Sequence, residues 1–110
     1  MAHEVGNLRA ARTRLGAFSR AAPAVMQGFG AVSKAATAPG AFSSAERELI
    51  AVAISVAKGC DDCILYHTEA AKRHGAQEDA LIEALEVAVE MGGGPAVMYA
   101  SKALSAWKEL

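Results

Sequence analysis

The apolar residues of this chain recur at intervals of three and four, and almost no segment alternates between apolar and polar side chains. Spacing of three and four puts side chains on one face of an α-helix, whereas alternation is typical of a half-buried strand. Alanine accounts for 26 of the 110 residues, and it combines the highest helix propensity with little side-chain volume. The sequence therefore predicts an all-α fold of about six helices that pack closely.

Glycine, proline and capping residues interrupt the periodic pattern where helix ends are expected. The clearest start is a capping box, in which Ser43 is the N-cap and Glu46 reaches back to its amide. The clearest end is Gly59, which is typical of a C-terminal cap. The predicted helices cover about residues 3–20, 23 to the loop at 38–40, 44–58, 60–74, 77–91, and 95 to the end.

The apolar faces of three predicted helices indicate where these helices pack. The helix at 44–58 is apolar on nearly all sides, so we expect it to be central and buried on more than one face. The first two helices each carry a single apolar stripe, which we expect to provide their packing contacts. The stripes are Leu8, Leu15 and Phe18 on the first helix, and Val25, Phe29, Val32 and Ala36 on the second.

Length and charge limit the class of protein. A chain of 110 residues fits one domain spanning 1–110. Its 11 basic and 12 acidic residues are spread along the chain, so no basic surface for nucleic acid or an anionic membrane is expected. The longest apolar run, 49–57, is less than half of the roughly 20 residues that span a membrane, and no signal peptide is visible. We expect a cytoplasmic protein, and an oligomeric one because large apolar side chains are few.

The two cysteines, Cys60 and Cys63, are three residues apart, and His67 follows four residues later. On a helix these spacings put all three side chains on one face. Cys60 comes just after Gly59, where unpaired amides and the helix dipole would stabilise a thiolate. His67 can accept a thiol proton or hold the thiolate as an ion pair near neutral pH. The pattern predicts a redox-active pair with a proton partner.

A thiolate beside a second thiol is sufficient to reduce a peroxide without a metal or an organic cofactor. One sulfur attacks the peroxide and becomes a sulfenic acid, and the other converts it to a disulfide. The acids between the cysteines, Asp61 and Asp62, favour the helix start but oppose a nearby thiolate. We expect both to point to solvent, where screening limits their effect.

Other interpretations of the cysteine pair stay open on spacing alone. The cysteines could be buried core residues, since free cysteine is commonly buried. They could ligate a metal in a non-catalytic helical module, with His67 as the third ligand and Glu48 or His74 as the fourth, although helical spacing is unlike the usual zinc knuckle. The chain could also be a redox-sensing oligomeric scaffold, in which the disulfide changes assembly.

Four spaced residues resemble the signature of the alkyl hydroperoxidase D-like branch of the carboxymuconolactone decarboxylase family: Glu48, Cys60 twelve positions later, Cys63 and His67. Three flanking segments agree with this resemblance: the apolar helix before the cysteines, the Glu-Ala-Ala-Lys-Arg-His-Gly-Ala segment after them, and the Met-Gly-Gly-Gly-Pro turn. The similarity therefore covers roughly 21–110. The resemblance implies an all-helical fold. It also implies a thiol-dependent peroxidase or disulfide oxidoreductase of the peroxiredoxin type.

The resemblance assigns a role to each of these residues. Cys63 corresponds to the peroxidatic cysteine and Cys60 to the resolving one. Glu48 and His67 correspond to the proton relay. The resemblance further implies a hydroperoxide substrate, a dithiol reductant such as a lipoyl group or a thioredoxin-like protein, and a homo-oligomer, trimer or hexamer, with the site near subunit contacts. The decarboxylases of the family lack the cysteine pair, and characterised alkyl hydroperoxidase D proteins have histidine where this chain has Asp62.

Overall fold

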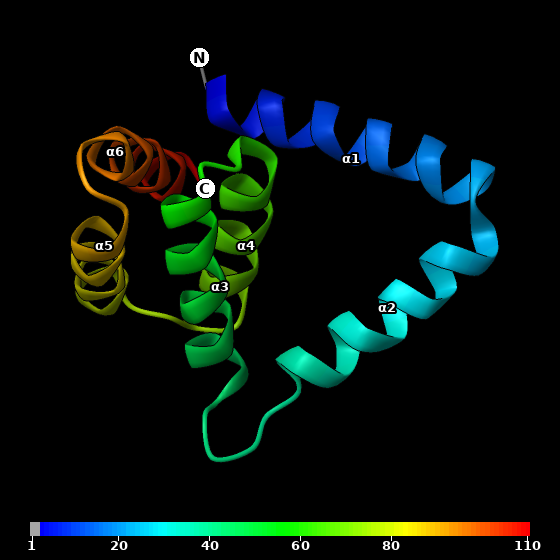
Figure 1. Cartoon of the computed structure of the whole chain (residues 1–110), viewed down its shortest axis with the longest axis horizontal. Coiled ribbons are helices and arrows are strands. Elements are labelled where there is room, and N and C mark those ends of the chain that lie inside the picture. Colours follow the sequence, from blue (N-terminus) through cyan, green and yellow to red (C-terminus); the bar gives the residue numbers. More distant parts are fainter. Residues whose placement is uncertain (1–2) are drawn as a thin grey trace.

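The computed structural model describes residues 3–110, which form six α-helices (Figure 1). No strand occurs within this range. The all-α prediction is confirmed, and each predicted helix has an observed counterpart with similar ends. In chain order the helices are α1 (His3–Ala21), α2 (Pro23–Thr37), α3 (Ser44–Lys58), α4 (Asp61–Arg73), α5 (Glu78–Gly92) and α6 (Gly94–Glu109).

Both ends of α3 follow the local sequence signals. The Ser43 hydroxyl accepts a hydrogen bond from the Glu46 amide at 3.1 Å, and the Glu46 carboxylate accepts one from the Ser43 amide at 2.8 Å. At the other end Gly59 has φ 72°, in the left-handed region that favours glycine. The chain thus turns from α3 into α4 within two residues, so that the two helices pack side by side.

The main hydrophobic core lies between α3, α4, α5 and α6, and α3 contacts the other three (Figure 1). Small residues let the turn between α5 and α6 approach α3 closely. A Cβ on Gly92 would lie 2.7 Å from the Ala96 Cβ and 3.3 Å from the Ala57 Cα. The buried members of this core are Leu49, Val52, Val56, Ile64, Ala71, Leu81, Leu85, Ala88, Ala96, Ala103 and Trp107.

The central position predicted for α3 is confirmed, but its burial is incomplete. Ile50 and Ile54, one turn apart, are both exposed. They form an exposed apolar strip on a helix whose opposite face is buried in the core. None of the helices in the described part of the chain is long and apolar enough to cross a membrane.

The first two helices extend away from the four-helix core as an arm (Figure 1). α1 is attached by its first half, where Leu8 is buried with Leu65 of α4 and Ala106 of α6. α2 then turns back toward α3 and contacts only α1 and α3. No residue of α2, which the structure describes in full, is buried.

Of the residues in the first two apolar stripes, only Leu8 is buried within the chain. Leu15 and Phe18 of α1 are exposed, as is the whole α2 stripe of Val25, Phe29, Val32 and Ala36. The exposed fractions of Val25, Phe29 and Val32 are 67%, 62% and 63%. The physical reason is that α3 to α6 pack on one another, which leaves no helix of the same chain to cover this stripe.

The capping box at α3 gives a direct test of local stability. Replacing Ser43 with alanine removes the acceptor for the Glu46 amide, and we expect a loss of about 1 kcal/mol in the free energy of unfolding, measured with urea. Ser105→Ala, at an exposed position inside α6, is the matched control and should change stability little. Equal losses in the two variants would show that the cap does not stabilise α3.

Candidate active site

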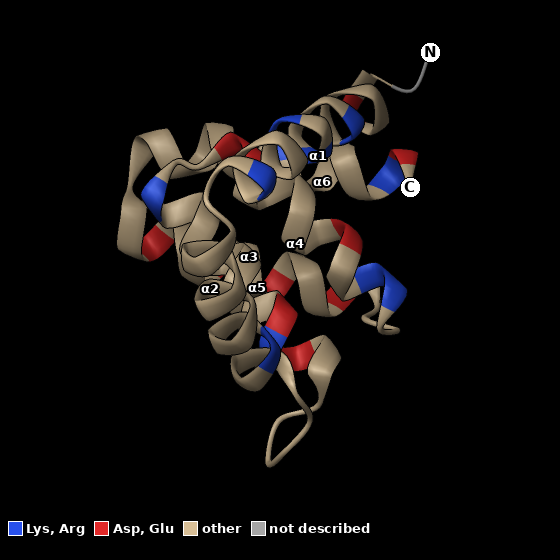
Figure 2. Cartoon of the chain, turned by 90° about the vertical axis from the view of Figure 1, so that its right-hand side faces the viewer, with Lys and Arg blue, Asp and Glu red and all other residues tan. Residues whose placement is uncertain are grey.

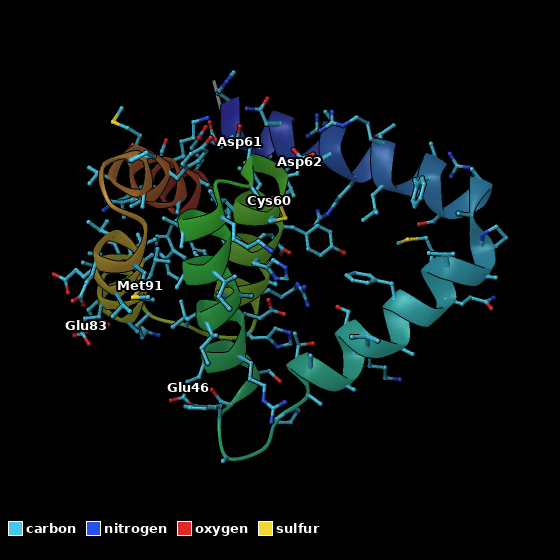
Figure 3. All side chains as sticks on the ribbon, viewed as in Figure 1. Glu46, Cys60, Asp61, Asp62, Glu83 and Met91 are labelled. Atoms are coloured by element: carbon cyan, nitrogen blue, oxygen red, sulfur yellow. A yellow bond between two sulfur atoms is a disulfide. The ribbon has the colours of Figure 1, made fainter. Side chains whose placement is uncertain are left out.

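Cys60 and Cys63 form a disulfide at the N-terminal end of α4, with their Cα atoms 5.3 Å apart. Figure 3 shows Cys60 and the sulfurs on the side of α4 that is turned toward the arm. Cys60 lies in the turn between α3 and α4, Cys63 lies in the first turn of α4, and both are partly buried. The structure therefore corresponds to the oxidised form of a dithiol pair.

Cys60 is the N-cap of α4 rather than its first helical residue, which corrects the predicted start at 60. Its backbone is extended (φ −103°, ψ 100°), and its Sγ accepts a hydrogen bond from the Cys63 amide at 3.3 Å. Cys63 lies in the first turn of the helix. Both sulfurs thus lie at the end of α4 where free amides and the helix dipole favour negative charge.

Glu48 of α3 and His67 of α4 meet between the two helices. Their closest polar atoms, Glu48 Oε1 and His67 Nδ1, are 2.7 Å apart. Glu48 is only 6% exposed, so its carboxylate is buried at the contact between the two helices. A buried carboxylate needs a hydrogen-bond partner, and the imidazole provides one.

This hydrogen bond determines which nitrogen of His67 can exchange a proton. With Glu48 ionised, Nδ1–H donates to the carboxylate and the ring orientation is held. Nε2 makes no hydrogen bond within the part of the chain that the structure describes, and the His67 side chain is 28% exposed. Since His67 follows Cys63 by one helical turn, the imidazole lies on the same side of α4 as that cysteine.

The aromatic residue beside His67 connects the site to α1. The Tyr66 ring stands edge-on to the His67 ring, with centroids 5.9 Å apart. The Arg12 guanidinium of α1 lies 5.7 Å from the centroid of the Tyr66 ring. Tyr66 is itself exposed, so it borders the site without closing it.

Asp61 and Asp62 are exposed, as the sequence predicted, but each also accepts a hydrogen bond from a cation of another helix. Asp62 accepts a hydrogen bond from Arg14 Nη2 of α1 at 2.9 Å, and Asp61 accepts one from Lys102 Nζ of α6 at 2.9 Å. The hydrogen bond and negative charge of Asp61 raise the pKa of Lys102 above its ordinary value of 10.5. Because the pKa is raised, Lys102 is protonated at neutral pH, and its ion pair with Asp61 is lost only as the pH rises through that pKa.

Sequence reasoning missed Arg14 and Lys102 as members of this region. They lie 48 and 41 residues from the acids that they contact, so no local spacing connects them. The one signal available was the pair of acids itself, because adjacent carboxylates favour nearby cations. Figure 3 shows Asp61 and Asp62 side by side at the start of α4.

The ligand set considered for a metal is not brought together. Within residues 3–110, no group of three or more His, Cys, Asp or Glu side chains is arranged to hold a metal ion. His74, one of the two fourth ligands considered, caps the far end of α4 and is exposed. The side chains that do come together are the disulfide of Cys60 and Cys63, and the hydrogen-bonded Glu48 and His67.

Known proteins resemble this chain in sequence, and one solved structure resembles it in the arrangement of helices. A sequence model of the carboxymuconolactone decarboxylase family matches residues 23–106. An uncharacterized protein of Cupriavidus necator is 54% identical over 92 residues, which cover 84% of this chain and 81% of that one. An uncharacterized protein encoded in the cox locus of Paracoccus denitrificans is 39% identical over 100 residues, 91% of this chain and 90% of that one.

A solved structure extends the comparison to three dimensions. It is the crystal structure of a carboxymuconolactone decarboxylase family protein from Legionella pneumophila in its apo form. It has a TM-score of 0.93 and 38% sequence identity, and the match covers 99% of this chain and 97% of the other. The chain belongs to the carboxymuconolactone decarboxylase family.

Proposed function

We propose that the chain is a thiol-dependent peroxidase of the alkyl hydroperoxidase D-like branch of the family, which reduces hydroperoxides through Cys60 and Cys63. The observation that carries the proposal is the disulfide at the start of α4, one helical turn before an imidazole that is hydrogen-bonded to a buried carboxylate. Family membership supports an enzyme. The cysteine pair favours redox chemistry over decarboxylation.

In the first step the Cys63 thiolate attacks one peroxide oxygen. An S–O bond forms, the O–O bond breaks, and Cys63 becomes a sulfenic acid while an alkoxide leaves. His67, which accepted the thiol proton, returns it to the alkoxide through Nε2 to give an alcohol. Glu48 holds the ring and stabilises the positive charge that the imidazole carries between these events.

In the second step Cys60 attacks the Cys63 sulfur. The S–S bond forms, the S–O bond breaks, and hydroxide leaves with the Cys60 proton as water. The disulfide in the structure corresponds to this product. A dithiol donor, such as a lipoyl group or a thioredoxin-like protein, then supplies two electrons and two protons and becomes a disulfide itself. This recycling requires a reducing compartment, which favours the cytoplasm.

Cysteine variants test the two roles separately. We expect Cys63→Ser to abolish peroxide consumption, because it removes the attacking sulfur. Cys60→Ser should consume one equivalent and stop with a sulfenic acid on Cys63, detected by dimedone labelling and mass spectrometry. A Cys63→Ser protein that consumed peroxide at the wild-type rate would rule out the proposal. If instead Cys60→Ser abolished consumption and Cys63→Ser stopped after one equivalent, Cys60 would be the peroxidatic cysteine and Cys63 the resolving one.

Variants of the relay test the assignment of Glu48 and His67. His67→Gln should lower the second-order rate constant for peroxide by about 10²-fold, the usual size of general acid–base assistance. Glu48→Gln should lower it less, because the amide still holds the ring but carries no charge. Stopped-flow peroxide kinetics measure both. Glu83→Gln, at an exposed position of α5, is the control and should leave the rate unchanged. Unchanged rates in both relay variants would contradict the assigned roles.

The exposed apolar faces support assembly of identical copies. An isolated 15-residue helix with two internal glycines, such as α2, is marginal in water, so α2 needs a surface that covers its stripe. α2 carries a single charged residue, Lys34, and Figure 2, viewed from the side of the arm, shows α2 almost free of charged residues. An uncharged face can be self-complementary. We infer a homo-oligomer, and the family resemblance favours a trimer or hexamer.

Light scattering after size-exclusion chromatography tests this assembly. We expect a mass of three or six chains for the wild-type protein, and a smaller species for Phe29→Asp, which puts a charge in the middle of the α2 stripe. Gln27→Asp adds the same charge to the same helix off the stripe and should leave the mass unchanged. A wild-type monomer, or equal effects of the two variants, would contradict the inference. Different masses for oxidised and reduced protein would instead support the redox-sensing scaffold.

A further inference from the structure

We propose that Arg14 and Lys102 are positioning residues of the redox site: by pairing with Asp62 and Asp61 they offset the acids between the cysteines and keep the thiols acidic enough to react. The inference rests on the proposed thiol chemistry. It adds two residues, from α1 and α6, that no local sequence pattern connects to the cysteines.

The need for compensation follows from the position of the acids. Asp61 directly follows Cys60, and Asp62 directly precedes Cys63. A carboxylate near a thiol favours the neutral thiol and raises its pKa, against the helix dipole that lowers it. Two uncompensated carboxylates in the first turn of α4 would reduce the thiolate fraction at neutral pH.

The geometry supplies one cation for each acid, from two different helices. Arg14 Nη2 lies 2.9 Å from Asp62 Oδ2, and Lys102 Nζ lies 2.9 Å from Asp61 Oδ1. These four residues line one cavity of about 300 Å³ between α1, α4 and α6. The other charged or titratable groups near the cysteine turn include His3 and Glu4 of α1 in the same cavity and the Glu48–His67 pair between α3 and α4. They also include Lys58 at the end of α3, Tyr66 beside His67, and Tyr99 of α6, which lies against Gly59 and the Lys102 ammonium.

The side chains of both ion pairs are more than half exposed. An electrostatic effect of these pairs on the thiols can therefore be distinguished from an effect on folding stability. Exposed pairs contribute little to folding stability because both partners stay hydrated. Each acid is nevertheless adjacent to a cysteine in sequence, so a thiolate there experiences the negative charge that is no longer offset when the cation is removed. Removing either cation should therefore change the thiol pKa much more clearly than it changes thermal stability.

The test measures the rate of alkylation of the reduced, full-length protein by iodoacetamide as a function of pH, which reports the pKa of the more reactive thiol. We expect Arg14→Gln and Lys102→Gln each to raise this pKa by about 0.3–0.6 unit, the size of an exposed charge interaction. Asp62→Asn should lower it by a similar amount. The Arg14→Gln/Asp62→Asn double variant should return near the wild-type value, and 1 M salt should shrink all of these shifts.

Matched control variants distinguish the effect of losing a charge from the effect of disturbing the fold. Arg9→Gln, also exposed on α1, should leave the thiol pKa unchanged, and Arg14→Lys should keep it near the wild-type value because it keeps the charge. An unchanged pKa in both Arg14→Gln and Lys102→Gln would overturn the inference, as would equal shifts in Arg14→Gln and Arg9→Gln. Because alkylation needs no peroxide, these results are independent of whether the peroxidase proposal holds.

Discussion

The packing of α3 against α4 determines where every group of the site lies. Gly59, with its left-handed backbone, lets the chain reverse within two residues and brings the second turn of α3 beside the second turn of α4. Glu48 and His67 meet there, and their hydrogen bond makes a buried carboxylate tolerable in an otherwise apolar interface. The same turn presents Cys60 as the cap of α4, so the thiols and the imidazole occupy successive turns of one helix.

The sequence predicted the elements that depend on local chemistry. Ser43 and Gly59 mark the ends of α3, and the spacing from Cys60 to His67 places three of the four site residues on one helix. The contact with Glu48 came from the resemblance to a family, because spacing cannot show how two helices face each other. The ion pairs of Arg14 and Lys102 join segments more than 40 residues apart. Only the packing of three helices brings these segments together.

The α2 stripe shows a different limit of sequence reasoning. Its periodicity correctly predicts an amphipathic helix, but periodicity does not say whether the covering surface belongs to the same chain. In this structure the stripe finds no cover within the chain. Assembly of identical copies would cover it. At the cysteine turn, Asp62 stands where the resemblance to the alkyl hydroperoxidase D-like branch would place a histidine, and it is paired with Arg14 of α1.

The proposed function requires that a hydroperoxide oxidise Cys60 and Cys63 to a disulfide. Its most direct test is a titration of the fully reduced protein with hydroperoxide, followed by thiol counting and mass spectrometry of the peptide that contains both cysteines. We expect one equivalent of peroxide to remove both thiols, to yield one equivalent of alcohol and to leave an internal disulfide, which a dithiol reverses. Peroxide that remains unconsumed while both thiols stay free would contradict it.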